Sequence, residues 1–180
     1  MLGNETLWEA ALASHRALTD ASIPHAILGG VAVCLHGYQR NTVDIDLLVR
    51  PTDGDAIQHA LTAAGWNWDA QQRQFTIASA AVLQFLLAGD RAGSGSELRF
   101  PDPSAADVVT ELEGLPVLTL ARLIETKLAS GQGDARRMHK DFADVVELIA
   151  RHDLHRSFGR KLHKSLRTTF NELVSRARGE

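Results

Sequence analysis

The sequence has a single cysteine and no long apolar run. Cys34 stands alone among 180 residues, so no disulfide framework exists, and its apolar surroundings predict a small core residue. No apolar run approaches the roughly 18 residues that a membrane-spanning helix needs. The opening segment, MLGNETLWEA, lacks the basic and apolar regions of a signal peptide. We therefore expect a soluble, cytoplasmic protein without a membrane partner.

Basic residues are scarce in most of the chain and concentrated at its end. Residues 1–150 carry 11 Lys and Arg against 19 Asp and Glu, whereas residues 151–180 carry 8 against 3. A basic end on an acidic body can bind nucleic acid. It can equally be a solvated helix face that packs on an acidic neighbour, and the sequence leaves both interpretations open.

The hydrophobic pattern changes along the chain from mixed elements to helices alone. Helical spacing is present at 5–20, 30–37, 54–64, 119–130, 134–151 and 154–177. Short strands are predicted at 25–28, 43–49, 66–68, 73–77, 81–87 and 108–114. We expect an α+β fold, with a mixed sheet and its flanking helices in a core of residues 1–115. Residues 116–180 are expected to form a helical C-terminal part packed on this core.

Two aspartates interrupt the strand VDIDLLV. Side chains two residues apart on a strand share one face, so Asp44 and Asp46 should lie about 7 Å apart. Val43, Ile45, Leu47 and Val49 would then face the core. Carboxylates this close repel each other unless water or a cation relieves the repulsion, and Mg²⁺ accepts such a pair together with phosphate oxygens. The alternative is a surface acid pair without a metal.

A glycine pair precedes the aspartates by 13 residues. Gly29 and Gly30 separate a predicted strand from a predicted helix, where a bare main chain lets a phosphate group approach closely. The same pair could serve only the dihedral angles of a tight turn. Arg40 could add positive charge against a phosphate, or could simply lie on the surface.

A lysine and an aspartate on two later helices form a second candidate pair. Lys127 falls inside the apolar stripe of the helix LTLARLIETKLAS, so it must extend to solvent, pair with a buried acid or face a cleft. On the next helix, Asp141 lies on the flank of the apolar stripe, whereas Asp144 lies nearly opposite it. Asp141 is therefore the better placed of the two to reach Lys127.

Together these motifs resemble a known family. The segment GGVAVCLHGYQRNTVDIDLLV is similar to the nucleotidyltransferase fold of the DNA polymerase beta superfamily, especially to AbiEii-type toxin nucleotidyltransferases. The phrases LARLIETK and KDFAD resemble the later motifs of the same proteins. The resemblance implies that Gly29 and Gly30 contact the triphosphate and that Asp44 and Asp46 hold Mg²⁺. It also implies that Lys127 and Asp141 support nucleotide binding and catalysis, and that an antitoxin protein is a partner.

The chain departs from the family pattern at two positions. Many superfamily members carry serine where this chain has Gly30, which supplies no hydroxyl. They also place a third carboxylate on a neighbouring strand, where the segment AVLQFLL offers Gln84. An amide is a weaker metal ligand and base than a carboxylate. Asp90, Glu97 and Asp107 are substitutes by charge, but they lie in loop-like segments.

The sequence thus predicts a Mg²⁺-dependent nucleotidyltransferase that moves a nucleoside monophosphate from a nucleoside triphosphate to an acceptor hydroxyl. Lys127 and Arg40 join the glycine pair in nucleotide binding, and Asp44, Asp46, Lys127 and Asp141 are the expected catalytic residues. The acceptor could be an RNA end, a protein or a small molecule, and an RNA would contact the basic segment 156–178. The alternatives are a non-catalytic nucleotide-binding module and an interaction protein whose charged residues form only a salt-bridge network.

Overall fold

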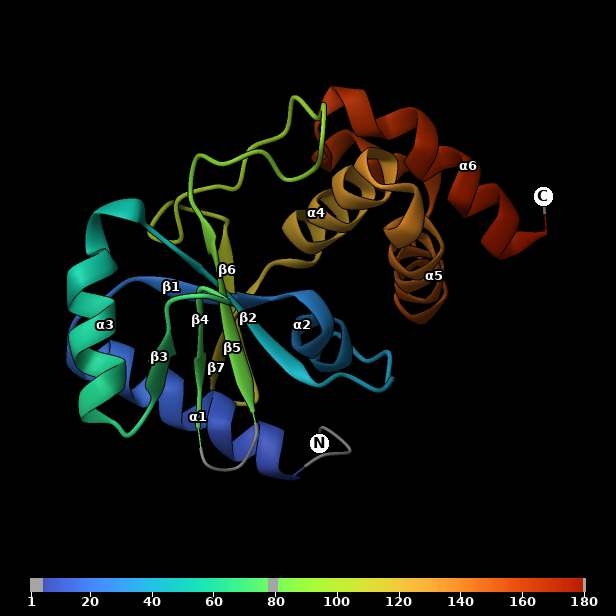
Figure 1. The fold of residues 1–180 in the computed structure, drawn as a ribbon. Helices are drawn as coiled ribbons and strands as arrows, with labels where there is room; N and C mark the ends of the chain where they lie inside the picture. Colours follow the sequence, from blue (N-terminus) through green and yellow to red (C-terminus); the bar gives the residue numbers. More distant parts are fainter. Residues whose placement is uncertain (1–4, 78–80, 180) are drawn as a thin grey trace.

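The computed structural model describes residues 5–77 and 81–179, and a mixed sheet lies at its centre (Figure 1). Its strands are β1 (His25–Leu28), β2 (Asp44–Val49), β3 (Asn67–Asp69), β4 (Gln74–Thr76), β5 (Val82–Leu87), β6 (Val109–Leu112) and β7 (Leu115–Leu118). The strand order is β3-β4-β5-β2-β1-β7-β6. Strand β2 runs antiparallel to β1 and parallel to β5, and β1 runs parallel to β7. This mixed arrangement confirms the predicted α+β class.

Helices cover both faces of the sheet. In Figure 1, α1 (Glu5–Asp20) and α3 (Gly54–Ala63) lie on one side, and α2 (Gly29–Leu35), α4 (Leu120–Gly133) and α5 (Ala135–Arg151) lie on the other. The C-terminal helix α6 (Arg167–Arg178) packs against α5. Shorter 3₁₀ turns are η1 (Pro51–Asp53), η2 (Arg156–Lys161) and η3 (Lys164–Leu166). In the part of the chain that the structure describes, no helix is both long and apolar enough to cross a bilayer.

Alternation along β2 places the aspartates and the core side chains on opposite faces. Ile45 and Leu47 are fully buried, whereas Asp44 and Asp46 are half-buried. Val43 was predicted to join the apolar face, but it lies just before β2 and is 68% exposed. Cys34 is buried in α2, as its apolar surroundings predicted.

Strand β7 was missed by the sequence pattern. It follows β6 through a two-residue turn in which Glu113 and Gly114 both have positive φ, at 49° and 78°. A turn of this kind matches the twist of paired strands and is a hairpin signal. Pro116 is a poor strand former, so the four residues of β7 carry little strand signal of their own.

The single helix predicted over 154–177 is wrong, because the chain breaks before α6. Leu162 and His163 adopt extended backbone angles, with ψ of 155° and 139°, between η2 and η3. The main-chain N–H of His163 donates to Oε1 of Glu125 on α4 at 2.6 Å. Glu125 is only 2% exposed and its Oε2 atom accepts from Arg122, so the bond from His163 satisfies the second oxygen of a buried carboxylate, which a continuous helix would leave without a donor.

Candidate active site

The glycine pair forms an elbow directly beside the two aspartates. Leu28, the last residue of β1, is in register with Asp46 on β2, and Gly29 follows it with φ of +66°. A Cβ on Gly29 would lie 1.8 Å from the Oδ2 atom of Asp46. A Cβ on Gly30 would lie 2.3 Å from the Oγ1 atom of Thr42, whose hydroxyl donates to Asp44 at 3.3 Å. Only a bare main chain therefore fits this close to the aspartates.

Asp46 lies in an environment that opposes its negative charge. Burial is the main cause that raises the pKa of Asp46, to about 6, and repulsion by Asp44 adds to it. The nearby cations Lys127, Arg137 and Lys140 lower the pKa only in part. A divalent cation would relieve the repulsion. Within residues 5–77 and 81–179, no group of three or more Asp, Glu, His or Cys side chains forms a metal site, so this pair would rely on water or phosphate oxygens for the remaining ligands.

An amide takes the position next to Asp46 on the neighbouring strand. Gln84 of β5 is in register with Asp46 on one side and with Gln74 of β4 on the other. Its Nε2 atom lies 3.4 Å from the Oε1 atom of Gln74. The polar row across β2, β5 and β4 thus contains one carboxylate followed by two amides.

The substitute acids do not reach this row. Asp90 lies in the turn after β5 and lines the larger cavity described below, together with Gln84, and Glu97 and Asp107 are exposed in loops. Asp107 has φ of 62° at a loop position. None of these three carboxylates is in register with Asp46 on β5, where the neighbouring position is Gln84.

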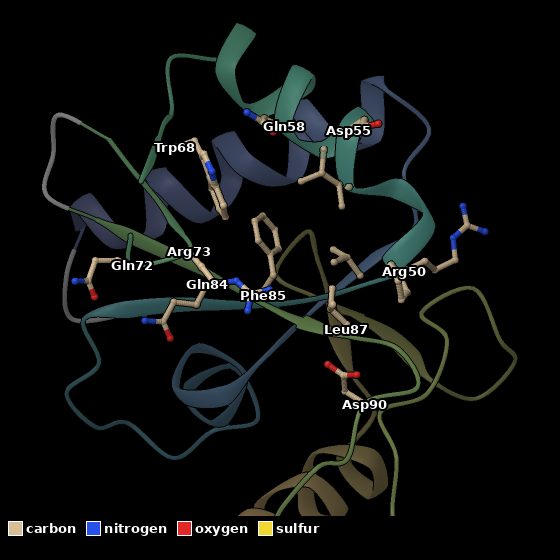
Figure 2. Close-up of a pocket in the computed structure, with 14 residues that line it drawn as sticks. Arg50, Asp55, Gln58, Trp68, Gln72, Arg73, Gln84, Phe85, Leu87 and Asp90 are labelled. Atoms are coloured by element: carbon tan, nitrogen blue, oxygen red, sulfur yellow. The ribbon is translucent and has the colours of Figure 1, made fainter. Parts of the chain in front are cut away.

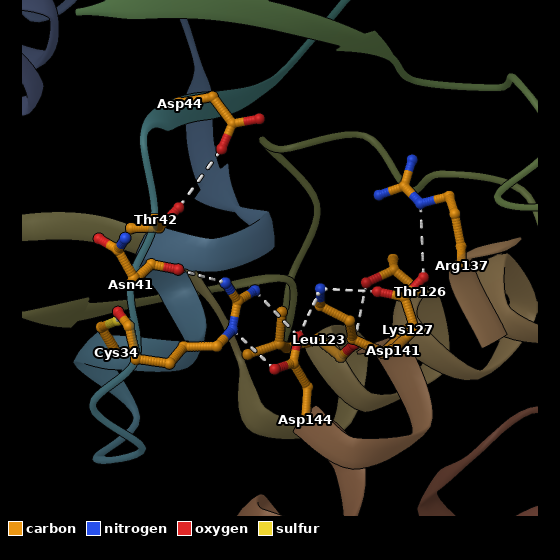
Figure 3. A network of polar contacts seen from close by, with 11 residues as sticks. Cys34, Asn41, Thr42, Asp44, Leu123, Thr126, Lys127, Arg137, Asp141 and Asp144 are labelled. Carbon is orange, nitrogen blue, oxygen red and sulfur yellow. Dashed lines mark hydrogen bonds and ion pairs between the residues drawn. The ribbon is translucent and has the colours of Figure 1, made fainter. Parts of the chain in front are cut away.

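Lys127 pairs with buried acids, one of the three outcomes that its position allowed. Its side chain is 7% exposed, and its Nζ atom lies 2.9 Å from Asp141 and 2.8 Å from Asp144 (Figure 3). The expectation that Asp144 points away from Lys127 is wrong, since Asp144 is 1% exposed and reaches the same ammonium group. Helix α5 packs against α4 on one side and α6 on another, so more of its surface is buried than one apolar stripe indicates.

Arg40 belongs to the same network. Its Nε and Nη2 atoms donate to the two carboxylate oxygens of Asp144 at 2.7 and 3.0 Å, a bidentate pair. Its Nη1 atom donates to the carbonyl of Asn41 at 3.0 Å. The structure therefore places Arg40 next to Gly30 but engaged with α5, and its predicted contact with a phosphate stays a prediction.

A cavity of about 250 Å³ joins the two groups of residues. Gly29, Asp46, Lys127 and Asp141 all line it. The remaining lining residues include Gln84, Arg91, Thr126, Ser130 and Arg137.

Arg91 and Arg137 were not singled out from the sequence. Arg137 precedes Asp141 by four residues, a spacing that brings helical side chains together, but Arg91 lies in a loop without any such signal.

A larger cavity of about 660 Å³ lies on the other face of the sheet. Figure 2 shows it between α3 and the strands β3 to β5, with the side chains of Trp68 and Phe85 on the sheet side of the cavity. Phe85 and Leu87 alternate with Gln84 along β5, so their side chains point away from the aspartates. The larger cavity therefore contains none of the predicted catalytic residues.

The sheet order, the glycine elbow and the paired aspartates define a nucleotidyltransferase-like fold. Solved structures share it: ANT(2'')-Ia in complex with adenylyl-2''-tobramycin is 14% identical, with 91% of this chain and 96% of that chain covered and a TM-score of 0.56. JHP933 from Helicobacter pylori is 16% identical over 99% and 92%, with a TM-score of 0.51. The lincomycin-bound lincosamide antibiotic adenylyltransferase LnuA is 15% identical over 78% and 95%, with a TM-score of 0.50.

These similarities confirm the predicted fold. No protein-family model matches the chain, and no curated protein matches its sequence. At 14 to 16% identity, a shared fold carries no information on substrate. The special likeness to AbiEii-type toxins therefore stays a prediction.

Proposed function

We propose that this chain is a Mg²⁺-dependent nucleotidyltransferase that moves a nucleoside monophosphate from a nucleoside triphosphate to an acceptor hydroxyl. One observation carries the proposal: the bare elbow at Gly29 lies against Asp46, in a cavity also lined by the Lys127–Asp141 pair. Elements that are distant in sequence thus bring together a place for phosphate, the cavity-lining Asp46 with Asp44 beside it, and a buried cation. The nucleotidyltransferases that share the fold support the same activity.

Each residue has a role that follows from its surroundings. Asp44 and Asp46 would hold Mg²⁺. When bound, this ion neutralises negative charge on the phosphate groups. Gly29 and Gly30 leave room for the triphosphate, and Lys127 is a fixed cation for it. The Oδ2 atom of Asp141 is buried without a hydrogen-bond partner among the described residues.

That Asp141 oxygen can accept a hydrogen bond from the acceptor hydroxyl and polarise it for attack on the α-phosphorus. Pyrophosphate then leaves as the acceptor oxygen forms its new bond to phosphorus. Arg40 supports the site indirectly in this scheme, because it holds Asp144 in place beside Lys127.

The proposal also covers the molecule that accepts the nucleotide and the biological role of the protein. We propose a hydroxyl on an RNA end, a protein or a small molecule, and a toxin role with an antitoxin partner in the cytoplasm. The structures that share the fold include enzymes named for small antibiotics, which makes a small-molecule acceptor worth testing directly.

The test is transfer of label from each of the four common nucleoside triphosphates, with Mg²⁺, to total RNA, to protein or to antibiotic hydroxyls. We expect transfer by the wild-type protein and its loss in Asp44→Ala. Asp20→Ala removes an exposed carboxylate at the end of α1 and should keep full activity. No heat on calorimetric titration with Mg²⁺ and any of the four triphosphates would instead leave the charged residues as a purely structural network.

A second candidate function is a non-catalytic nucleotide-binding module. The amide of Gln84 beside Asp46 favours it. The register between β2 and β5 pairs one carboxylate with an amide, whereas two carboxylates would bind a metal more strongly. Tight nucleotide binding without transfer to any acceptor would support this candidate. Transfer that appears only in Gln84→Glu would support it further.

A further inference from the structure

The basic side chains around the candidate active site are unequally engaged. Arg40 is 12% exposed and gives two hydrogen bonds to Asp144. Lys127 is 7% exposed and lies within 2.9 Å of both Asp141 and Asp144. Two buried carboxylates therefore balance these two cations, and neither cation is free to turn toward an incoming anion without leaving a buried acid unpaired.

Arg137 lines the same cavity without being held in this way. Its side chain is 63% exposed, and its Nε atom lies 3.6 Å from the Oδ2 atom of Asp141 (Figure 3). This distance is too long for a hydrogen bond, which agrees with the lack of a partner for that oxygen among the described residues. Arg137 can therefore move to a new anion at little cost.

Arg91 approaches the cavity from a different element. It lies in the loop after β5 and makes no ion pair with any residue that the structure describes. The loop lies directly against α4, since a Cβ on Gly93 would lie 2.0 Å from the carbonyl oxygen of Ala129. Within the loop, the main-chain N–H of Ala92 donates to the carbonyl of Leu98 at 3.0 Å. The main chain that carries Arg91 is thus fixed against the helix that carries Lys127.

We propose that Arg91 and Arg137 bind the polyphosphate chain of the nucleotide in this cavity, in place of Arg40. The proposal rests on the nucleotidyltransferase function proposed above and assigns the phosphate contacts of that site. A guanidinium group can give two parallel hydrogen bonds to one phosphate, and two such groups from separate elements can hold adjacent phosphates. Asp46 lines the cavity as well, so the ligand is a di- or triphosphate accompanied by Mg²⁺ rather than a bare anion.

The test is calorimetric titration of the full chain with inorganic tripolyphosphate and Mg²⁺. We expect Arg91→Gln and Arg137→Gln each to weaken binding about tenfold or more, as loss of a charge-assisted hydrogen bond implies. Arg136→Gln is the matched control: this neighbour is exposed, does not line the cavity and carries the same charge. Urea unfolding of each variant checks that the fold is retained.

The outcomes separate this proposal from the general function. Equal weakening in Arg136→Gln and Arg137→Gln, or none in Arg91→Gln and Arg137→Gln, overturns the assignment of phosphate contacts. Transfer with an unchanged KM for the triphosphate in both cavity variants overturns it too, while leaving the transferase function intact. Tripolyphosphate binding that needs both arginines in a protein without transfer activity keeps the assignment and rejects the transferase.

Discussion

Gly29 combines a left-handed backbone with contact to Asp46, and no other residue type meets both demands. At φ of +66° a side chain costs about 1–2 kcal/mol, and a Cβ would overlap the carboxylate at 1.8 Å. We expect Gly29→Ala to lower the free energy of unfolding by at least that amount and to weaken nucleotide binding. Urea unfolding and calorimetric titration measure the two effects.

Gly54 provides the control for this substitution. It has helical angles, with φ of −51°, and nothing lies within 4 Å of its Cβ position. Gly54→Ala should therefore stabilise the protein by about 0.5–1 kcal/mol. Similar losses in both variants would argue against a special role for the elbow.

The raised pKa of Asp46 links the metal-free site to stability. The carboxyl has a pKa of about 6 in the folded protein against an ordinary value of 3.8, so the folded state holds the proton more tightly. This contribution favours folding below about pH 4 and is lost as the pH rises through 6, a difference of at most about 3 kcal/mol. In chelator at pH 8, Asp46→Asn should be more stable than the wild type.

The gain in Asp46→Asn should disappear at pH 4, where the wild-type carboxyl is protonated in the folded state. Urea unfolding at several pH values follows the change. Asp20→Asn, at an exposed position, is the control variant. A gain that stays constant from pH 4 to 8 would contradict the raised pKa.

At the scale of elements, one buried charge network joins three segments. Asp144 on α5 accepts from Arg40 in the loop between α2 and β2 and from Lys127 on α4. Removing the shared acid leaves the buried guanidinium of Arg40 without a carboxylate and Lys127 with Asp141 alone, so Asp144→Ala should cost about 3–5 kcal/mol in the free energy of unfolding. Glu147→Ala, on an exposed side of the same helix, should stay within about 0.5 kcal/mol. Equal effects in urea unfolding would show that the network adds no stability.

Elements with a clear period were predicted correctly, and those set by tertiary contacts were not. The apolar spacing of α1 and the alternation of β2 are local properties, so their positions followed from the sequence. The break before α6 depends on Glu125, a residue 38 positions away from His163. Such a contact leaves no trace in a local hydrophobic pattern.

The residues of the candidate site divide in the same way, into those predicted from local sequence and those placed by tertiary packing. Asp44, Asp46 and the glycine pair lie within one β-turn-α-β segment, so their proximity was predictable from spacing and strand geometry. The double pairing of Lys127 and the place of Arg91 depend on how α4, α5 and a loop pack together. The sequence of α5 shows one apolar stripe, whereas the fold buries two faces of the helix.

At the scale of the whole molecule, the concentration of basic residues near the end of the chain predicts that this segment binds RNA. Arg160, Lys161 and Lys164 are exposed in the basic segment, and Lys161 also lies 5.4 Å from the ring centre of Phe158. If these side chains bind phosphates, replacing all three by Gln should weaken binding of a single-stranded RNA. The slope of log K against log salt should fall by about 0.7 for each phosphate that the variant no longer neutralises.

Fluorescence anisotropy at several salt concentrations measures this slope. Arg16→Gln, on α1 at the far side of the sheet, should leave RNA binding unchanged. The same affinity and slope in the triple variant would favour the other interpretation, in which the basic segment is only a solvated surface packed on the acidic body.

The hydrogen bond between Glu125 and His163 has a consequence for shortened forms of the protein. Cutting the chain before His163 would strip a deeply enclosed carboxylate of its main-chain donor and leave Arg122 as its remaining neighbour. The same helix α4 presents Lys127 to the cavity two residues later. Trimming the far end of the chain would therefore loosen the wall of the pocket itself, although none of the removed residues touches it.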